Sequence, residues 1–491
     1  MAWIDRIFEG AAPQSVAVID HDGSGLTYAA LADRIEAMAG TLAALGLCGG
    51  DRMLLLAENS ADYITLLMAA ARLRAWPVPV NARITAPELD AITAHAEPAL
   101  IACATAASAE AAAHAARLGA VAQGGVAFLP RPGTLPEPVA DDPARQVGAM
   151  LYTSGTTGAP KGVMLSHLSL DFNAAMACRM RGMTADDRLL LALPGTHIMA
   201  LSTAILASLR AGACLQLLPR FTPQAVLAAL AEGATILPAV PAMYDALLRH
   251  LASSGASLIA PRLRQIGTGG APLDPGWKRR IEAAFGLTLN NGYGLTEAGP
   301  GIASTLLGPR REDGSVGHPY PDCEIRLDAP GADGVGELLV RGPNVMLGYF
   351  RDAQATAQAI TAEGFLRSGD LARIDPDGAI HITGRAKELI IRSGFNIYPP
   401  EVEAALSGCP GVVQVAVAGR AVPGNEEVVA FVLSDGSLTE AALRAWAAER
   451  LAGYKRPQHV ILVDEMPMTA AGKVRKPALL ALHADRLPAP V

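Results

Sequence analysis

The chain reads Thr153-Ser154-Gly155-Thr156-Thr157-Gly158-Ala159-Pro160-Lys161-Gly162 directly after an apolar run, Gly148–Tyr152, that is typical of a β-strand. Small hydroxyl residues and glycines let a backbone approach a phosphate closely, and their N–H and O–H groups donate hydrogen bonds to it. Lys161 adds a positive charge. The stretch is not a Walker A loop, because Pro160 replaces the required second glycine and Gly162 replaces the required Ser or Thr. We therefore expect a phosphate-binding loop of another class.

Outside this loop, the first half of the chain alternates short apolar runs with helical patterns. Met53–Ala57 and Trp76–Val80 are strand-like, and Asn59-Ser60 can cap the helix between them. Strands that alternate with helices predict an α/β fold with mostly parallel sheets. The segment from about Gly308 to His381 instead has short strands between Gly, Pro and Asp turns, which predicts a small β-rich subdomain. From Lys387 onward, strands and helices return and predict an α+β unit of about a hundred residues.

Composition excludes several functional classes. The 491 residues carry 40 Lys and Arg against 47 Asp and Glu, so the formal net charge is −7 and the basic excess of nucleic-acid binders is absent. With 49 Gly and 35 Pro, the chain stays below the about 25–30% that marks low-complexity sequences. The six cysteines form no CxxC or Cys/His cluster, which argues against a zinc site and for buried thiols in a reducing compartment.

One apolar stretch tests for a membrane span. Leu189–Leu209 contains no Asp, Glu, Lys or Arg, but Pro194-Gly195 divides it into a strand-length and a helix-length piece. Each piece is too short for a hydrocarbon core of about 30 Å. The first residues also lack the pattern of a signal peptide. We expect a cytoplasmic protein without a membrane span, in which this stretch forms buried core beside a pocket.

The phosphate loop resembles the signature of the adenylate-forming superfamily of acyl-CoA synthetases, peptide-synthetase adenylation domains and firefly luciferases. Four further motifs of that superfamily follow in the same order: Asn291–Glu297, Ser368–Leu371, the hinge motif Gly384–Glu388 and the C-terminal lysine motif Thr469–Lys476. The resemblance implies an α/β fold with a large N-terminal domain, residues 1–386, built of layered α/β subdomains and a small β-barrel-like subdomain. A small, mobile α+β C-terminal domain, residues 387–491, would follow it.

The resemblance implies a reaction in two steps. A carboxylate attacks the α-phosphate of ATP to give an acyl-adenylate and pyrophosphate, and a thiol, usually coenzyme A, then displaces AMP. An anion thus approaches a polyanion, so positive charge from Mg²⁺ and lysine is essential. By resemblance, Glu297 and the hydroxyl of Thr153 lie near the metal ion. Lys473 would reach the α-phosphate and the carboxylate oxygens.

Other residues of these motifs are expected to bind the nucleotide and the thiol. Tyr293 would lie against the adenine, because an aromatic ring can stack on any base. Asp370 can accept both ribose hydroxyls, and Arg385 can donate to ribose or phosphate. Rotation about Lys387 would present the face near Gly394 to the pantetheine. The remaining positions that the resemblance assigns to nucleotide binding are Ser154, Gly155, Thr156, Thr157, Gly158, Lys161, Gly270, Ala271, Asn291, Gly294 and Thr296.

Three segments are expected to line the acid pocket: Pro194–Leu201, Gly269–Ala271, and Gly292 with Gly299–Ile302. Their residues are small or apolar. His197 stands at the gate position of the family, where an aromatic or histidine side chain borders the carboxylate. No Lys or Arg falls within the three segments, whereas malonate-activating relatives usually carry Arg at the position of Gly292. This favours an acid with a neutral aliphatic or aromatic tail.

The sequence therefore predicts an AMP-forming carboxylate–CoA ligase whose partners are a small carboxylic acid, ATP and CoA, with a homodimer left open. An adenylation enzyme that loads a carrier protein ranks lower, since Tyr454–Pro457 resembles a run of CoA ligases. A non-catalytic nucleotide-binding relative would be expected to have lost Lys473, Glu297 or the loop, and all are present. A luciferase-type oxygenase stays compatible with the motifs.

Overall fold

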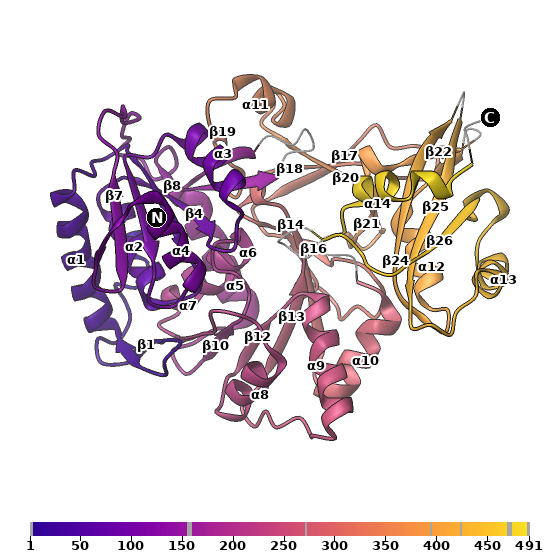
Figure 1. The fold of residues 1–491 in the computed structure, drawn as a ribbon, viewed down its shortest axis with the longest axis horizontal. Helices are drawn as coiled ribbons and strands as arrows, with labels where there is room; N and C mark the ends of the chain where they lie inside the picture. Colours follow the sequence, from indigo (N-terminus) through magenta and orange to yellow (C-terminus); the bar gives the residue numbers. More distant parts are fainter. Residues whose placement is uncertain are drawn as a thin grey trace.

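The structure is a computed structural model that describes residues 3–154, 160–270, 273–392, 395–422, 425–468 and 474–488, with Ser154 and Phe395 described by their backbone alone. Figure 1 shows a large N-terminal part and, to one side, a smaller C-terminal part in orange and yellow. The buried apolar clusters divide in the same way, since those of the large part end at Ile380 and those of the small part begin at Ile390. The predicted boundary between residues 386 and 387 falls in this interval and stays a prediction.

The largest sheet has nine strands in the order β16-β15-β14-β13-β12-β10-β11-β1-β2. They are β1 (Val16–Ile19), β2 (Gly25–Thr27), β10 (Arg188–Leu191), β11 (Cys214–Leu217), β12 (Ile236–Pro238), β13 (Gln265–Gly269), β14 (Leu289–Gly294), β15 (Gly301–Ser304) and β16 (His318–Pro319). Strands β14 to β1 run parallel, and the edges are antiparallel. At the carboxyl ends, where parallel sheets bind ligands, Gly269 pairs with Gly292 and so brings two predicted pocket segments together.

A second sheet has the strand order β4-β3-β5-β7-β6. Its strands are β3 (Arg52–Ala57), β4 (Trp76–Asn81), β5 (Leu100–Ala104), β6 (Val121–Gln123) and β7 (Val126–Pro130). Every residue of β3 is buried, which confirms the apolar strand expected there. The hydroxyl of Ser60 accepts a hydrogen bond from the N–H of Tyr63, so the expected cap begins the next helix.

The helices of the N-terminal part are α1 (Tyr28–Ala44), α2 (Ala61–Arg72), α3 (Ala86–Ala96), α4 (Ala109–Leu118), α5 (His167–Arg181), α6 (Ile198–Ala200), α7 (Ala207–Arg210), α8 (Pro223–Ala231), α9 (Pro241–Ser254), α10 (Pro275–Phe285) and α11 (Ala353–Ala359). The apolar stretch Leu189–Leu209 forms the end of β10, then α6, a π-helical turn over Leu201–Leu206, and the start of α7. Pro194-Gly195 separates strand from helix as expected. Among the described residues, no helix is long and apolar enough to cross a membrane.

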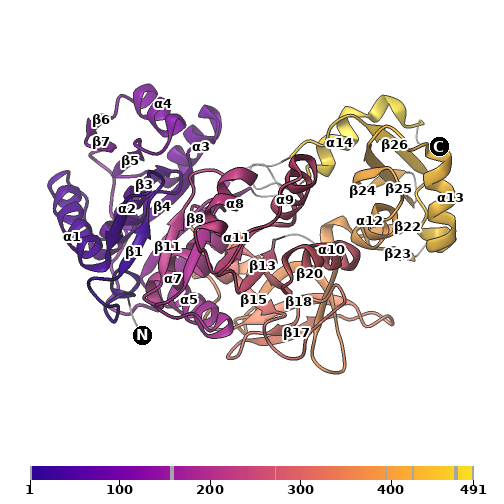
Figure 2. The ribbon, with the colours of Figure 1, turned by 90° about the horizontal axis from the view of Figure 1, so that it is seen from below.

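Two smaller sheets complete the N-terminal part. The phosphate-loop hairpin, β8 (Val147–Ser154) and β9 (Pro160–Ser166), forms a three-stranded sheet with β19 (Gly348–Tyr349). The predicted β-rich subdomain is a four-stranded antiparallel sheet at the lower edge of Figure 2. Its strands are β17 (Glu324–Asp328), β18 (Gly336–Arg341), β20 (Leu366–Ile374) and β21 (Ile380–Arg385).

The C-terminal part is an α+β unit, as the sequence predicts. It contains β22 (Ile390–Arg392), β23 (Phe395–Ile397), β24 (Val412–Val422), β25 (Asn425–Ser434), β26 (His459–Val463), α12 (Pro399–Ser407), α13 (Glu440–Arg450) and α14 (Lys476–Leu482). Strands β24, β25 and β26 form one sheet, and β22 pairs with β23. Its core is formed by apolar side chains such as Val402, Leu443 and Val428 from both helices and sheet.

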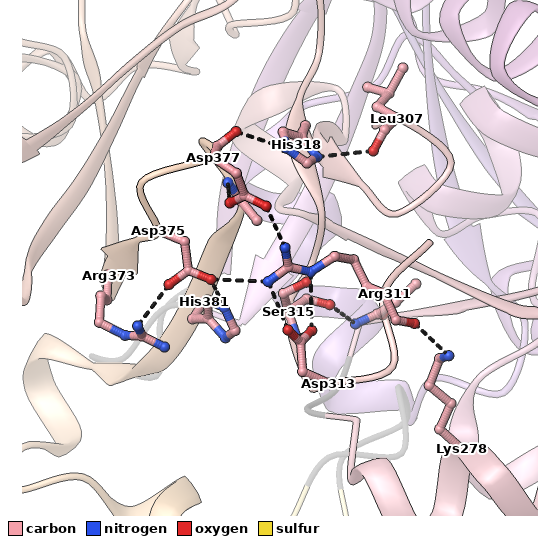
Figure 3. A network of polar contacts seen from close by, with 12 residues as sticks. Lys278, Leu307, Arg311, Asp313, Ser315, His318, Arg373, Asp375, Asp377 and His381 are labelled. Carbon is pink, nitrogen blue, oxygen red and sulfur yellow. Dashed lines mark hydrogen bonds and ion pairs between the residues drawn. The ribbon is translucent and has the colours of Figure 1, made fainter. Parts of the chain in front are cut away.

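A polar network ties the turn between β20 and β21 to the loop before β16 (Figure 3). Arg311 donates to Asp313 Oδ2 at 2.7 Å, to Asp375 Oδ2 at 3.0 Å and to Asp377 Oδ2 at 2.6 Å. His381 Nε2 lies 2.8 Å from Asp375 Oδ2. Burial alone would raise the pKa of Asp313, but hydrogen bonds from Arg311 and then Ser315 lower it to about 2.

Ligand atoms of Asp313, Asp375 and His381 lie within 4.8 Å of one another, as metal ligands would. Because the guanidinium already contacts both carboxylates, we assign this cluster to ion pairing.

We expect Arg311→Met to lower the free energy of unfolding by about 1–3 kcal/mol, because hydrogen bonds to charged groups are worth that much when half-buried. Denaturant unfolding at pH 7, with hydrogen exchange of residues 375–379, measures it. The lowered pKa of Asp313 stabilises the fold above its ordinary pKa, and this part is lost as the pH falls from 3.8 towards 2. The variant should therefore lose less stability over that interval. Arg310→Met, which removes an exposed neighbour, is the control. Equal stability of both variants would contradict the assignment.

Candidate active site

The phosphate loop is a hairpin whose two arms carry predicted residues side by side. In the register of β8 and β9, Thr153 lies opposite Lys161 and Ser154 lies opposite Pro160. A Cβ at Gly162 would lie 2.9 Å from Met150 Sδ and 3.3 Å from Phe350 Cβ, so a side chain here would force both neighbours to shift. The tip of the loop, with Gly155, Thr156, Thr157 and Gly158, lies outside the described residues, as does the side chain of Ser154.

Glu297 lies in a 3₁₀ turn, Thr296–Ala298, just after β14. The N–H of Met346 donates to its carbonyl at 2.8 Å, and the hydroxyl of Tyr349 donates to Glu297 Oε1 at 2.9 Å. The ammonium of Lys161 lies 4.9 Å from the centre of the Tyr349 ring. Tyr349 therefore connects the predicted metal ligand with the predicted phosphate-binding lysine.

The sequence analysis missed Tyr349. It stands in β19, which pairs with β9 so that Tyr349 lies opposite Val163, and the N–H of Phe350 donates to the carbonyl of Gly162 at 2.7 Å. Burial, and next the charge of Glu297, raise the pKa of Tyr349, so its hydroxyl stays a donor. A Gly-Tyr pair nearly 190 residues after the loop carries no local signal, because only the pairing of β19 with β9 brings it there.

Three motifs that are far apart in sequence meet at Asp370. The hydroxyl of Tyr293, from β14, donates to Asp370 Oδ2 at 2.5 Å. Nε of Arg385, from β21, lies 3.3 Å from Asp370 Oδ1, and the two residues are opposite each other in the register of β20 and β21. Burial first, and then the charge of Asp370, raise the pKa of Tyr293, so this phenol also stays protonated. The side chain of Asp370 is 11% exposed, which makes its carboxylate a preorganised acceptor for a polar ligand.

The other described positions of the predicted nucleotide site flank this cluster. The Oδ1 atom of Asn291 in β14 is enclosed without a hydrogen-bond partner among the described residues. Gly294 leaves no room for a Cβ against the carbonyl of Pro300. Thr296 begins the turn that carries Glu297, and Gly270 follows β13 with a φ of +78° that favours glycine.

The three expected segments of the acid pocket also meet. A Cβ at Gly269 would lie 2.9 Å from the carbonyl oxygen of Gly292 and 3.5 Å from Sδ of Met199. His197 precedes α6 and its Nδ1 accepts from the N–H of Met199 at 3.3 Å. Gly269 pairs with Gly292, and Gly294 pairs with Gly301, so both parts of the third segment lie beside the second. The structure thus places small residues from three elements around one point next to the nucleotide site.

Three predicted residues, Ala271, Gly394 and Lys473, lie outside the described residues. The lysine motif is described from Val474 onward, where Lys476 Nζ lies 2.8 Å from Glu388 Oε2 and 2.9 Å from Glu403 Oε1. Lys387, the predicted hinge, lies in a 3₁₀ turn over Ala386–Glu388. The hinge motif and the lysine motif are therefore in contact through Lys476.

Comparison with known proteins agrees with this geometry. The family model of AMP-binding enzymes matches residues 8–350, and that of the AMP-binding enzyme C-terminal domain matches residues 401–473. A feruloyl-CoA synthase of Amycolatopsis sp. is 38% identical over 479 residues, covering 94% of this chain and 95% of the relative. An indoleacetate–CoA ligase of Aromatoleum aromaticum is 35% identical and covers 99% of this chain and 98% of the relative.

Solved structures extend the similarity to the whole fold. ATP-bound MatB from Rhodopseudomonas palustris has a TM-score of 0.85 and 33% identity, covering 99% of both chains. The o-succinylbenzoate CoA synthetase MenE from Bacillus subtilis, in complex with ATP and magnesium, has a TM-score of 0.81 and 27% identity, covering 96% of this chain and 98% of that one. With both family models and these full-length relatives in agreement, the chain belongs to the family of AMP-binding enzymes.

Proposed function

We propose that the protein joins a carboxylic acid with a neutral aliphatic or aromatic tail to CoA by way of an acyl-adenylate. It is an AMP-forming acyl-CoA synthetase that uses ATP, Mg²⁺ and CoA. The convergence of Tyr293, Asp370 and Arg385 carries this proposal, because it brings together a carboxylate that can accept from ribose hydroxyls and a cation that can bind phosphate. The similarity to feruloyl and indoleacetate ligases, which are named for aromatic acids, supports the acid class.

The residues around Glu297 fit a magnesium ion. Carboxylate and hydroxyl oxygens, here from Glu297 and Thr153, are the hard donors that Mg²⁺ prefers beside phosphates. Tyr349 engages Oε1 of Glu297, and Oε2 makes no hydrogen bond among the described residues, so a carboxylate oxygen stays available. When bound, Mg²⁺ neutralises phosphate charge. Lys161 adds a second positive charge over the Tyr349 ring.

The remaining steps follow from the pocket. The acid enters the site between the segments around His197, Gly269 and Gly292, and its carboxylate attacks the α-phosphorus of ATP while pyrophosphate leaves. Lys473 is proposed to neutralise the charge that develops on the phosphate oxygens. The thiol of CoA then attacks the acyl carbon and AMP leaves. All six cysteines are free, which supports our proposal of a cytoplasmic location.

Pyrophosphate release tests this reaction directly. With ATP and Mg²⁺, we expect release of pyrophosphate for neutral-tailed acids, and multiple turnovers with an acyl-CoA product only when CoA is present. Mass spectrometry of the products, over a panel of short, medium, long and aromatic acids, identifies the acid class. An adenylate that forms without any thioester would instead support a carrier-protein acceptor. Absence of ATP cleavage over the whole panel would support a non-catalytic binding protein.

We expect Tyr349→Phe to raise the Mg²⁺ concentration for half-maximal rate by about tenfold or more, because partners that orient a metal ligand typically contribute that much affinity. The ring under Lys161 stays in this variant, so the change isolates the bond to Glu297. Two readouts measure it: the Mg²⁺ concentration for half-maximal rate, and Mn²⁺ binding with a non-hydrolysable ATP analogue followed by electron paramagnetic resonance. The control is Tyr28→Phe, which removes a buried hydroxyl bonded to the carbonyl of Ala213 far from the site. Unchanged Mn²⁺ binding in Tyr349→Phe would contradict this role of Tyr349.

A further inference from the structure

Arg181 is a partly buried cation that has no carboxylate partner among the described residues. It is the last residue of α5, and its Nη1 donates to the carbonyl of Thr203, which is 7% exposed. No ion pair of Arg181 occurs among the described residues, although two nearby arginines have such pairs: Arg210 with Asp171 and Arg264 with Asp187. Burial lowers the pKa of Arg181. An unpaired charge in this position costs stability, which points to a use other than folding.

The contacts of Arg181 place it behind the wall of the acid pocket. Thr203, which accepts its hydrogen bond, also donates from Oγ1 to the carbonyl of Met199 at 2.7 Å. Met199 in turn lies against Gly269, where its Sδ is 3.5 Å from the Cβ position of that glycine. Thr203 stands in the π-helical turn Leu201–Leu206, and such turns occur frequently at functional sites.

Tyr320 contacts the third pocket segment and lies near enough to Arg181 to be affected by its charge. The ring and hydroxyl of Tyr320 occupy the space where a Cβ at Gly301 would be, and Gly301 belongs to the third pocket segment. Burial raises the pKa of Tyr320 to about 12, and the nearby charge of Arg181 acts in the opposite direction. The hydroxyl makes no hydrogen bond among the described residues, yet it is not one of the fully enclosed polar atoms without a partner. Solvent-sized space therefore reaches it.

The guanidinium of Arg181 also has donor atoms that are neither hydrogen-bonded nor fully enclosed. Its Nε and Nη2 have no hydrogen-bond partner among the described residues, and they too are absent from the fully enclosed atoms. The guanidinium beside Thr203 and the phenol beside Gly301 thus both have donor atoms that are not fully enclosed. Donors without partners in such a position are suited to an acceptor atom of a ligand.

We propose that Arg181 and Tyr320 form a polar end of the acid pocket and select acids that carry an acceptor oxygen far from the reacting carboxylate. This rests on the proposed function. It also refines the expectation of a neutral tail, which considered only the three pocket segments, because α5 contributes a cation from outside them. The acceptor is the oxygen of a hydroxyl, ether, ketone or second carboxylate, since each accepts from a guanidinium.

Matched pairs of acids test this proposal. Each pair has the same carbon skeleton and differs only at the far end, where one member has a methyl group and the other a hydroxyl, methoxy, keto or carboxylate group. Both straight chains of graded length and para-substituted cinnamic acids are included, because the distance from the carboxylate sets which member reaches Arg181. The measured quantity is the ratio of kcat/KM for the oxygenated acid to that for its methyl partner, from pyrophosphate release.

For the best pair, we expect Arg181→Met to lower this ratio by about 10- to 100-fold, since hydrogen bonds to a charged group contribute that much. Tyr320→Phe should lower it less, because the bond that it removes is to a neutral donor. Arg179→Met, on the same turn of α5 but with an exposed side chain, should leave the ratio unchanged. A loss restricted to the carboxylate member would assign the end of the pocket to dicarboxylic acids, whereas losses for hydroxyl and keto members would assign it to neutral oxygens.

Thermal unfolding separates this role from a structural one. We expect Arg181→Met to keep or raise the melting temperature, because it replaces a partly buried unpaired charge by an apolar side chain of similar length. A lower melting temperature, together with an equal loss of kcat/KM for both acids of every pair, would overturn the proposal. So would an unchanged ratio in Arg181→Met. If the wild-type protein activates no acid, the proposed function itself is wrong. That outcome is seen before any variant is measured.

Discussion

The carboxylate of Asp370 joins two sheets that share no strand, and the geometry of the nucleotide site depends on this contact. Tyr293 approaches it from the nine-stranded sheet, and Arg385 approaches it from the neighbouring strand of the four-stranded sheet. Both partners stabilise the ionised carboxylate. Because Asp370 is largely shielded from water, removing either partner would lower the stability of this contact. The Arg311 network adds a second connection between the same two sheets at the far end of the β20–β21 hairpin. Held at both ends, the hairpin can present Asp370 and Arg385 with little conformational freedom.

Local patterns predicted much of this. The strand–helix alternation, the cap at Ser60 and the break at Pro194-Gly195 all act over a few residues, so the sequence alone sufficed for them. Glu297, Asp370 and Arg385 were predicted from motifs that resemble those of the family, in which each residue stands within a short contiguous stretch, and their roles stay predictions. Tyr349 and Tyr320 could not be found in this way. Their roles arise from pairing of β19 with β9 and from packing of a ring on Gly301, and neither leaves a local trace.

The same limit of local sequence patterns applies to the acid pocket. Glycines at the wall show where a ligand approaches the backbone, but they say nothing of what lies behind it. Arg181 lies on α5, outside the three wall segments, and donates to the carbonyl of Thr203 just beyond the first of them, so a search of the wall segments for charge misses it. Electrostatic effects extend beyond direct neighbours in a medium of low dielectric constant, so the identity of a tail depends on side chains that line no segment of the wall.

The C-terminal part has a comparable constraint. Lys476 is largely buried between Glu388 and Glu403, and the charges of both glutamates act to raise its pKa against the opposing effect of burial. Glu403 in turn accepts from the N–H of Val417 at 2.8 Å, so the hinge motif, α12, β24 and the start of α14 are connected. Separating these partly buried pairs would cost stability, which favours movement of these elements as one body. The rotation of the C-terminal part stays a prediction, and its pivot is then expected before Glu388, which agrees with the hinge predicted at Lys387.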